Sequence, residues 1–218
     1  MLTVLSCDSE RTFNAELSDE LQKLRDIDQT VAVGYVSRDT ASELNDMSLA
    51  RWTAYHDSIL SAHQARVKEI FEEEGYPGYD LVGKQGESNF WVLVQHCDSD
   101  PTFQKRVLIK LKENVDRKNA NGQNYGLLTD RVKINTGEKQ IYGTQVTFNS
   151  MGQAYPKMLF DSVNVNRRRS EVGLEPLEEY LNMMTMMNFD MNKGFLKSKG
   201  ITKPKLYETD GIVIKLER

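Results

Sequence analysis

The alternation of apolar and polar positions predicts a chain built mainly from amphipathic helices. Apolar residues recur every three or four positions in residues 8–28, 48–74 and 100–115, which places them on one face of each helix. A further short helix should run to Val132, and another should cover residues 176–188. Residues 87–97 are apolar nearly all the way round, so we expect them to be buried whether they are helical or extended.

Turn and cap residues fix two of these boundaries. Gly75-Tyr76-Pro77-Gly78 should end the second helix, because proline cannot continue a helix and glycine tolerates the turn. Asp100 can cap the third helix, and Pro101 suits its first turn. Residues 119–123 break the helical pattern. Residues 30–36 lean toward β-structure, but Gly34 interrupts them and they stay unassigned.

Strand-like patterns appear in the second half. Tyr142, Thr144, Val146 and Phe148 alternate with other side chains across residues 140–148, which is the period of a strand. Near the end, residues 206–208 and 212–216 flank Thr209-Asp210-Gly211, a hairpin pattern.

These elements predict an α+β fold, a helix-rich single domain with a small antiparallel sheet or hairpins in its second half. Its organisation would be an N-terminal helix and connection over residues 1–44, a core over residues 45–188, and a C-terminal tail with a hairpin over residues 189–218.

Composition excludes some classes of protein. The 218 residues carry 28 Lys and Arg against 32 Asp and Glu, a net charge of −4, which argues against general nucleic-acid binding but leaves room for a local basic patch. No apolar run reaches the roughly 18 residues of a transmembrane helix. Cys7 and Cys97 are too few for a disulfide scaffold or a four-thiolate metal site.

The first residues are compatible with two cellular locations. Residues 2–7 read like the end of a bacterial lipoprotein signal, with Cys7 as the lipid-anchor position. A genuine signal would place a basic segment and a longer apolar core before that cysteine, and Met1 leaves no room for either. The alternatives are a cytoplasmic chain with an ordinary start, or a chain anchored to the cell envelope whose start has been trimmed.

Histidines supply the first candidate chemistry. His56 and His63 lie seven residues apart on one predicted helix, about 10 Å, which is too far for easy ligation of one metal ion, so we expect no metal site there. Gln95-His96-Cys97-Asp98 places polar groups against an apolar segment. Burying such groups is costly without partners, so they need either internal hydrogen bonds or a ligand.

Polar groups in the second half can be read in two ways. Asp130 and Arg131 form either an anchoring salt bridge or an arginine fork that a carboxylate holds toward an anion. Tyr142-Gly143-Thr144-Gln145 either lines a polar pocket or satisfies buried backbone groups. Arg167-Arg168-Arg169 binds an anion or, as we favour, forms a solvated helix face paired with Glu171 and Glu175.

An ordered set of motifs resembles an uncharacterised bacterial domain family over roughly residues 45–185. Tyr76 and Asn166 stand where that family usually has Trp and Asp. The resemblance implies matched polar positions and no known activity or cofactor. The motifs that carry it are Gly75-Tyr76-Pro77, Gln95-His96-Cys97-Asp98, Asp130-Arg131-Val132, Gln140-Ile141-Tyr142-Gly143-Thr144-Gln145, Val165-Asn166-Arg167-Arg168-Arg169 and Gly173-Leu174-Glu175-Pro176-Leu177.

Two functions are compatible with these residues. The first is a ligand-binding or interaction module with a polar cleft for an unidentified small molecule or protein partner. Its ligand-binding residues would be Gln95, Arg131, Tyr142, Thr144, Gln145 and Arg168.

The alternative is an enzyme that hydrolyses or transfers groups on an anionic or amide-containing substrate. His96 would be the general acid–base, with Asp98 or Asp130 orienting it and Arg131 with Arg168 binding the anion. No cofactor is assigned to it. Both functions require these distant residues to meet in one solvent-accessible cleft.

Overall fold

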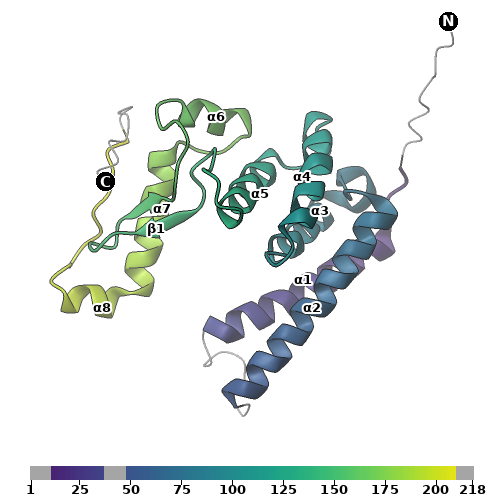
Figure 1. Ribbon diagram of the computed structural model, residues 1–218, viewed down its shortest axis with the longest axis horizontal. Helices are drawn as coiled ribbons and strands as arrows, with labels where there is room; N and C mark the ends of the chain where they lie inside the picture. Colours follow the sequence, from purple (N-terminus) through teal and green to yellow (C-terminus); the bar gives the residue numbers. More distant parts are fainter. Residues whose placement is uncertain (1–10, 37–47, 210–218) are drawn as a thin grey trace, which may run out of the picture. The chain divides into compact units, whose positions relative to one another are not determined.

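The computed structural model describes residues 11–36 and 48–209. The helices and the two strands follow the chain in one series (Figure 1). These elements are α1 (Ala15–Val36), α2 (Leu49–Glu74), α3 (Tyr79–Gln95), α4 (Pro101–Asp116), α5 (Gly122–Asn135), β1 (Val146–Phe148), β2 (Ala154–Pro156), α6 (Val165–Glu171), α7 (Leu177–Met191) and α8 (Lys193–Ser198). The strands pair antiparallel, with Thr147 opposite Tyr155. The helix-rich α+β class, with its small sheet in the second half, is confirmed.

The chain divides into two compact units, Met1–Asn121 and Gly122–Arg218. The boundary falls inside residues 119–123, where the helical pattern breaks. The first unit contains α1 to α4, and the second contains α5 to α8 with the two strands. The division into residues 1–44, 45–188 and 189–218 stays a prediction.

The expected bounds of α2 and the expected start of α4 are confirmed by their caps. The Ser48 hydroxyl accepts a hydrogen bond from the Arg51 N–H at 3.3 Å and begins α2. Gly75, with φ at 69°, ends it. The Asp100 carboxylate accepts from the Phe103 N–H at 2.9 Å, and Pro101 occupies the first turn of α4.

One segment differs from the sequence prediction, and two segments whose secondary structure the sequence left open are helical. Residues 30–36 are helical, because Val31 is buried in the core and packing there outweighs local β-propensity. Residues 87–95 belong to α3. The strand predicted over residues 140–148 is wrong before Val146: Gly143 takes a φ of 77°, which turns the backbone out of an extended path. The predicted C-terminal hairpin depends on residues 210–216, which lie outside the described residues.

Each unit has its own apolar core. In the first, Leu21, Ile70 and Phe90 are fully buried, and Phe71 meets Phe103 edge-to-face at 5.6 Å between ring centroids. In the second, one cluster joins the sheet to α6 and α7 and is formed by Ala154, Val165, Leu177 and Leu181. Burying a large apolar side chain contributes about 1.5–3 kcal/mol, so these clusters are the main source of stability.

The end of the described chain is fixed against α7. The Tyr207 N–H donates to the Asn182 side-chain oxygen at 2.7 Å, and the Asn182 amide donates back to the Tyr207 carbonyl at 2.9 Å. The Tyr207 hydroxyl donates to the Ala154 carbonyl at 2.7 Å. None of the helices in the described part of the chain combines the length and apolar character needed to cross a bilayer.

A buried tyrosine–glutamate pair connects the turn after α2 to α3. The Tyr76 hydroxyl donates to the Glu87 carboxylate at 2.5 Å, and both side chains are almost fully buried. The Tyr76 ring also meets Phe90 edge-to-face at 5.5 Å. Burial and the neighbouring Glu87 carboxylate raise the pKa of Tyr76 well above its ordinary value, so the phenol keeps its proton as a donor.

We expect Tyr76→Phe to lower the free energy of unfolding by about 1–3 kcal/mol, because Glu87 would stay buried after losing a donor. Urea denaturation monitored by circular dichroism measures the change. Tyr79→Phe is the matched control, since Tyr79 lies nearby and is half-buried, and its effect should stay within about 0.5 kcal/mol. Equal losses in the two variants would contradict the role given to the pair.

Candidate functional site

His96 and Asp28 form a carboxylate–imidazole pair in the first unit. His96 is the residue that ends α3, and Asp28 projects from α1. His96 Nδ1 lies 2.8 Å from Asp28 Oδ1. The Asp28 side chain is 1% exposed, whereas the His96 ring is 31% exposed. A buried acid therefore holds an imidazole that solvent can reach.

The pair fixes the tautomer of the imidazole. An ionised carboxylate only accepts hydrogen bonds, so Nδ1 carries the proton that it donates to Asp28. The other ring nitrogen, Nε2, is then the basic one, and the ring reaches solvent. This is the arrangement in which a histidine can take a proton from an outside group and pass it on.

Neighbouring amides support both members of the pair. The Gln29 side-chain amide donates to Asp28 Oδ2 at 3.2 Å. The Gln64 amide of α2 donates to the His96 carbonyl at 3.2 Å and accepts from the Ser99 hydroxyl at 3.1 Å. Two helices distant in sequence thus hold His96: α1 contacts its imidazole and α2 binds its carbonyl.

His63 lies buried close to this pair. Its Nδ1 makes no hydrogen bond to any of the residues that the structure describes. Burial is the largest influence on its pKa and lowers it, the Asp28 carboxylate opposes this, and His96 lowers it further. His63 is therefore held neutral more strongly than a histidine in water.

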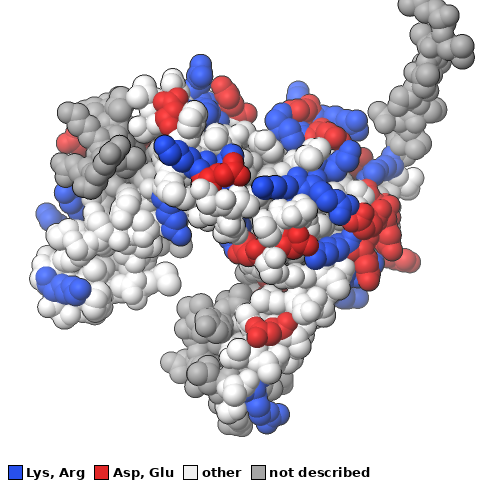
Figure 2. Space-filling view, in the orientation of Figure 1, with Lys and Arg blue, Asp and Glu red and all other residues white. Residues whose placement is uncertain are grey.

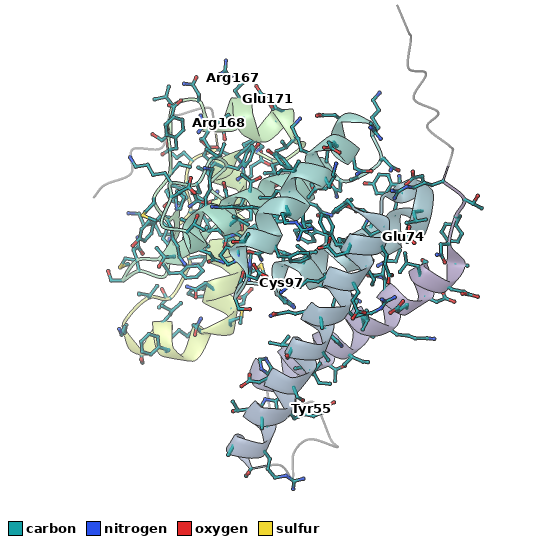
Figure 3. All side chains as sticks on the ribbon, turned by 45° about the vertical axis from the view of Figure 1, so that its right-hand side comes forward. Tyr55, Glu74, Cys97, Arg167, Arg168 and Glu171 are labelled. Atoms are coloured by element: carbon teal, nitrogen blue, oxygen red, sulfur yellow. The ribbon has the colours of Figure 1, made fainter. Side chains whose placement is uncertain are left out.

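The other residues predicted around His96 have different roles. Asp28 is a carboxylate that contacts the imidazole. Asp98 is exposed and accepts from the Gln104 amide at 3.4 Å, and its role as the orienting carboxylate stays a prediction. The Gln95 carbonyl also accepts from Gln104 at 3.4 Å, and the Gln95 side chain is half-buried. Cys97, labelled in Figure 3 after α3, is buried, and burial raises the pKa of its thiol to about 12. It is not a nucleophile at neutral pH.

A pocket of about 250 Å³ lies between α1 and α2. Ile27, Val31 and Tyr55 form its apolar wall, and Asp26 and Thr30 complete it. Its wall includes α1 residues on either side of Asp28. Across the parts of the chain that the structure describes, no group of three or more His, Cys, Asp or Glu side chains is placed to hold a metal ion.

In the second unit, Asp130 of α5 binds a tight loop over residues 140–145. Its carboxylate is fully buried and accepts from the backbone N–H groups of Ile141 at 2.6 Å, Tyr142 at 3.0 Å and Thr144 at 2.9 Å. The Thr144 hydroxyl adds a fourth donor at 3.1 Å. Burial raises the pKa of Asp130, and these hydrogen bonds offset part of that effect.

Side chains from α6 and α7 bind the carbonyl groups of the same loop. Arg168 Nε donates to the Ile141 carbonyl at 3.0 Å, and Arg169 Nη1 donates to the Tyr142 carbonyl at 2.7 Å. The Tyr180 hydroxyl donates to the Thr144 carbonyl at 2.8 Å.

Gln140 completes the network. Its side-chain oxygen accepts from the Gln145 N–H at 2.9 Å, and its amide donates to the carbonyls of Gln145 and Lys157. The N–H groups of the loop thus donate to a carboxylate, and its carbonyls accept from arginines.

The arginine cluster divides its roles. Arg167 is exposed and lies 3.9 Å from Glu171 on α6, as the favoured solvated-face interpretation requires (Figure 3). Arg168 binds Ile141, Phe160 and Asp161. Arg169 is fully buried, donates to the Glu175 carbonyl at 2.6 Å and stacks over the Tyr180 ring, so for this residue the solvated-face interpretation is wrong.

The structure therefore brings the predicted site residues together in two groups. Gln95, His96 and Asp98 lie in the first unit. Asp130, Tyr142, Thr144, Gln145 and Arg168 meet around the loop of the second unit, and Arg131 is half-buried on α5 beside Asp130. Most polar groups of the second set bind one another. One cleft shared by both groups stays a prediction.

Sequence reasoning missed Asp28 and Arg169. A signal for Asp28 was present, because the apolar stripe of Leu17, Leu21 and Leu24 continues to residue 28 at helical spacing. A carboxylate on the buried face of a helix needs a partner. The run of three arginines gave no sign of which member is buried.

The chain belongs to a family of unknown function (DUF6624), whose match covers residues 16–190. This range spans parts of both compact units. Comparisons with curated proteins and with solved structures gave no match.

We expect Asp130→Asn to lower the free energy of unfolding by roughly 2–4 kcal/mol, because an amide offers one acceptor oxygen and turns N–H donors toward the loop N–H groups. Chemical denaturation measures the loss. Asp116→Asn is the control: Asp116 pairs with Lys112 on the exposed face of α4, and its loss should stay below about 1 kcal/mol. Similar stabilities for the two variants would contradict the role of Asp130.

His63 predicts a pH dependence of stability. Its folded-state pKa lies below its unfolded value of about 6.5, so the unfolded chain binds more protons as the pH falls, and stability is lost below about pH 6.5. His63→Gln should reduce this slope by at most about 1.4 kcal/mol per pH unit. Denaturation curves between neutral and mildly acidic pH test this, and an unaltered slope in His63→Gln counts against it.

Proposed function

We propose that this DUF6624 protein is an enzyme in which His96 acts as general acid–base and Asp28 orients it. The supporting observation is the 2.8 Å contact between a buried carboxylate and a partly exposed imidazole. The reaction class is hydrolysis or group transfer on an anionic or amide-containing substrate.

The proton path follows from the tautomer. His96 Nε2 takes a proton from a water molecule or a substrate hydroxyl as that oxygen attacks the substrate. Asp28 stabilises the positive charge that develops on the ring, since its carboxylate already accepts from Nδ1. The ring then gives the proton from Nε2 to the leaving group. Gln95, half-buried directly before His96, is proposed to position the substrate.

Direct attack is favoured over a covalent intermediate. The thiol of the adjacent Cys97 is buried, and its Sγ lies 3.5 Å from the Leu93 carbonyl as a hydrogen-bond donor. The Ser99 hydroxyl donates to Gln64, and His96 Nδ1 contacts Asp28. A nucleophilic thiol or hydroxyl needs a base within hydrogen-bond distance. The contacts described above do not join either group to the His96 ring.

A purely structural role for the pair is the main competitor. A buried aspartate needs a donor wherever it lies, and His96 supplies one. A structural pair would serve equally well with the ring fully buried, whereas the His96 side chain is 31% exposed, so an outside molecule can approach the ring. Removal of the base separates the two roles. It lowers turnover if the pair is catalytic, and it lowers stability if the pair is structural.

We expect His96→Gln to reduce turnover by about 10²–10⁴-fold, the usual contribution of a general acid–base. Asp28→Asn should also reduce it, because the amide no longer stabilises a positively charged ring. The assay uses chromogenic esters, amides and phosphate esters with wild-type protein and each variant. His56→Gln is the matched control, since His56 pairs with the neighbouring Asp57 at 3.1 Å and has no part in the mechanism.

A second measurement does not depend on the substrate. Nitrogen NMR of the imidazoles should show His96 protonated at Nδ1 in the neutral form, and Asp28→Asn should change that tautomer balance. If wild-type protein turns over no substrate, or if His96→Gln keeps full turnover, the enzyme proposal fails. Loss of melting temperature alone in His96→Gln would indicate a structural pair.

A ligand-binding or interaction module is the second candidate. The observation that favours it lies in the second unit, where an apolar helix face is exposed. Met183, Met186 and Met187 of α7 are about half exposed. Such a face is typical of a surface that another protein covers.

A further inference from the structure

Residues 201–209 form a segment that returns from α8 and lies beside α7 (Figure 1). Its first residue, Ile201, is buried in a small apolar cluster with Phe189 and Leu196. Tyr207 is half-buried against α7 and β2, and of the five residues between Ile201 and Tyr207 all except Pro204 are exposed. Tyr207 is therefore bound at a place of its own, separate from the start of the segment.

The backbone of Tyr207 is bound by one side chain of α7. The Asn182 amide oxygen accepts from the Tyr207 N–H at 2.7 Å, and the Asn182 NH₂ group donates to the Tyr207 carbonyl at 2.9 Å. In an extended chain the N–H and the carbonyl of one residue point to the same side, so a single amide can bind both. Any residue except proline offers these two groups, so Asn182 recognises an extended peptide chain and not a particular side chain.

The Tyr207 side chain adds specificity to this contact. Its hydroxyl donates to the Ala154 carbonyl of β2 at 2.7 Å, and its ring packs against the apolar cluster that joins the sheet to α6 and α7. Burial, and to a smaller extent the neighbouring Tyr155, raise the pKa of Tyr207, so the hydroxyl keeps its proton as a donor. Phenylalanine would fill the same space without the donor. The site is thus complementary to an extended segment that carries a tyrosine.

Charge contributes little to this contact. Figure 2 shows the surface over α7 and α8 as mostly uncharged, with basic side chains among the white atoms. The charged residues of the segment beside Tyr207, Lys205 and Glu208, are exposed. Main-chain hydrogen bonds that give affinity, with one buried side chain that gives specificity, are typical of peptide recognition.

We propose that the Tyr207 site is a peptide-binding site, in which an extended, tyrosine-containing segment of another protein replaces residues 204–208 of this chain. Because the residues before Tyr207 are exposed, Tyr207 can leave its site while Ile201 stays in its own cluster. Release of Tyr207 also leaves the core beneath it in place, since the buried residues of that core belong to the sheet, α6 and α7. They are Ala154, Val165, Leu177 and Leu181.

The chain's own segment competes with any peptide that is added. It is tethered a few residues from its site, and a short flexible tether gives an effective concentration in the millimolar range. A separate peptide that makes the same contacts must exceed that concentration before it fills the site of the wild-type protein. Removing the Tyr207 side chain weakens the competitor, whereas Asn182 and the Ala154 carbonyl stay in place to bind the added peptide.

Binding of the segment as a separate peptide tests the proposal. In fluorescence anisotropy titrations, we expect full-length Tyr207→Ala to bind a fluorescein-labelled peptide of residues 202–209 at least about tenfold more tightly than the wild-type protein does. Leu206→Ala is the matched control, because Leu206 is adjacent and 46% exposed, and this variant should bind the peptide as weakly as the wild type. Equal affinities of Tyr207→Ala and the wild type overturn the proposal.

Two further changes test the recognition itself. In the Tyr207→Ala protein, adding Asn182→Ala should weaken peptide binding about tenfold, and so should alanine in place of the tyrosine of the peptide. Circular dichroism checks that each variant keeps its helices. If Tyr207→Ala unfolds, Tyr207→Phe, which loses only the hydroxyl bond, should still bind the peptide more tightly than the wild type does.

The remaining outcomes are distinct. Equal binding of the tyrosine and alanine peptides would leave the segment a purely structural strap. A wild-type dimer in sedimentation equilibrium that Tyr207→Ala converts to monomers would assign the site to the segment of a second copy; either result overturns the proposal. These variants do not involve His96 or Asp28, so the outcome is independent of the proposed catalytic activity.

Discussion

Burying a carboxylate is the constraint on which both units depend. Asp28, Glu87 and Asp130 are each no more than 1% exposed, and a carboxylate without donors in such a place would cost several kcal/mol. Each therefore accepts from donors outside its own helical turn: His96 for Asp28, Tyr76 for Glu87, and three loop N–H groups for Asp130. These contacts fix which segments of the chain meet.

The same constraint has two different chemical consequences. Backbone N–H groups cannot lose their protons at ordinary pH, so the acid of α5 forms a fixed structural centre. An imidazole can gain and lose a proton near neutral pH, so the acid of α1 faces a group able to do chemistry. Because the His96 ring is partly exposed, an outside molecule can exchange a proton with it.

The sequence predicted the helices well where caps and periodicity agreed, as at Ser48, Gly75 and Asp100. It failed for residues 140–145, because their alternation resembles a strand while their backbone is bent to give its N–H groups to Asp130. His96 was found from its polar setting. Asp28 was not, because periodicity shows that a residue faces inward but not which distant side chain it meets there.

Order of synthesis has a consequence for the loop over residues 140–145. Asp130 leaves the ribosome before the loop does, so the N–H groups can be bound as soon as they emerge. Arg168, Arg169 and Tyr180, which bind the carbonyls, follow 27 to 36 residues later. In a nascent chain, therefore, only the N–H groups of this loop are bound until α6 and α7 have been synthesised. The loop reaches its final conformation late.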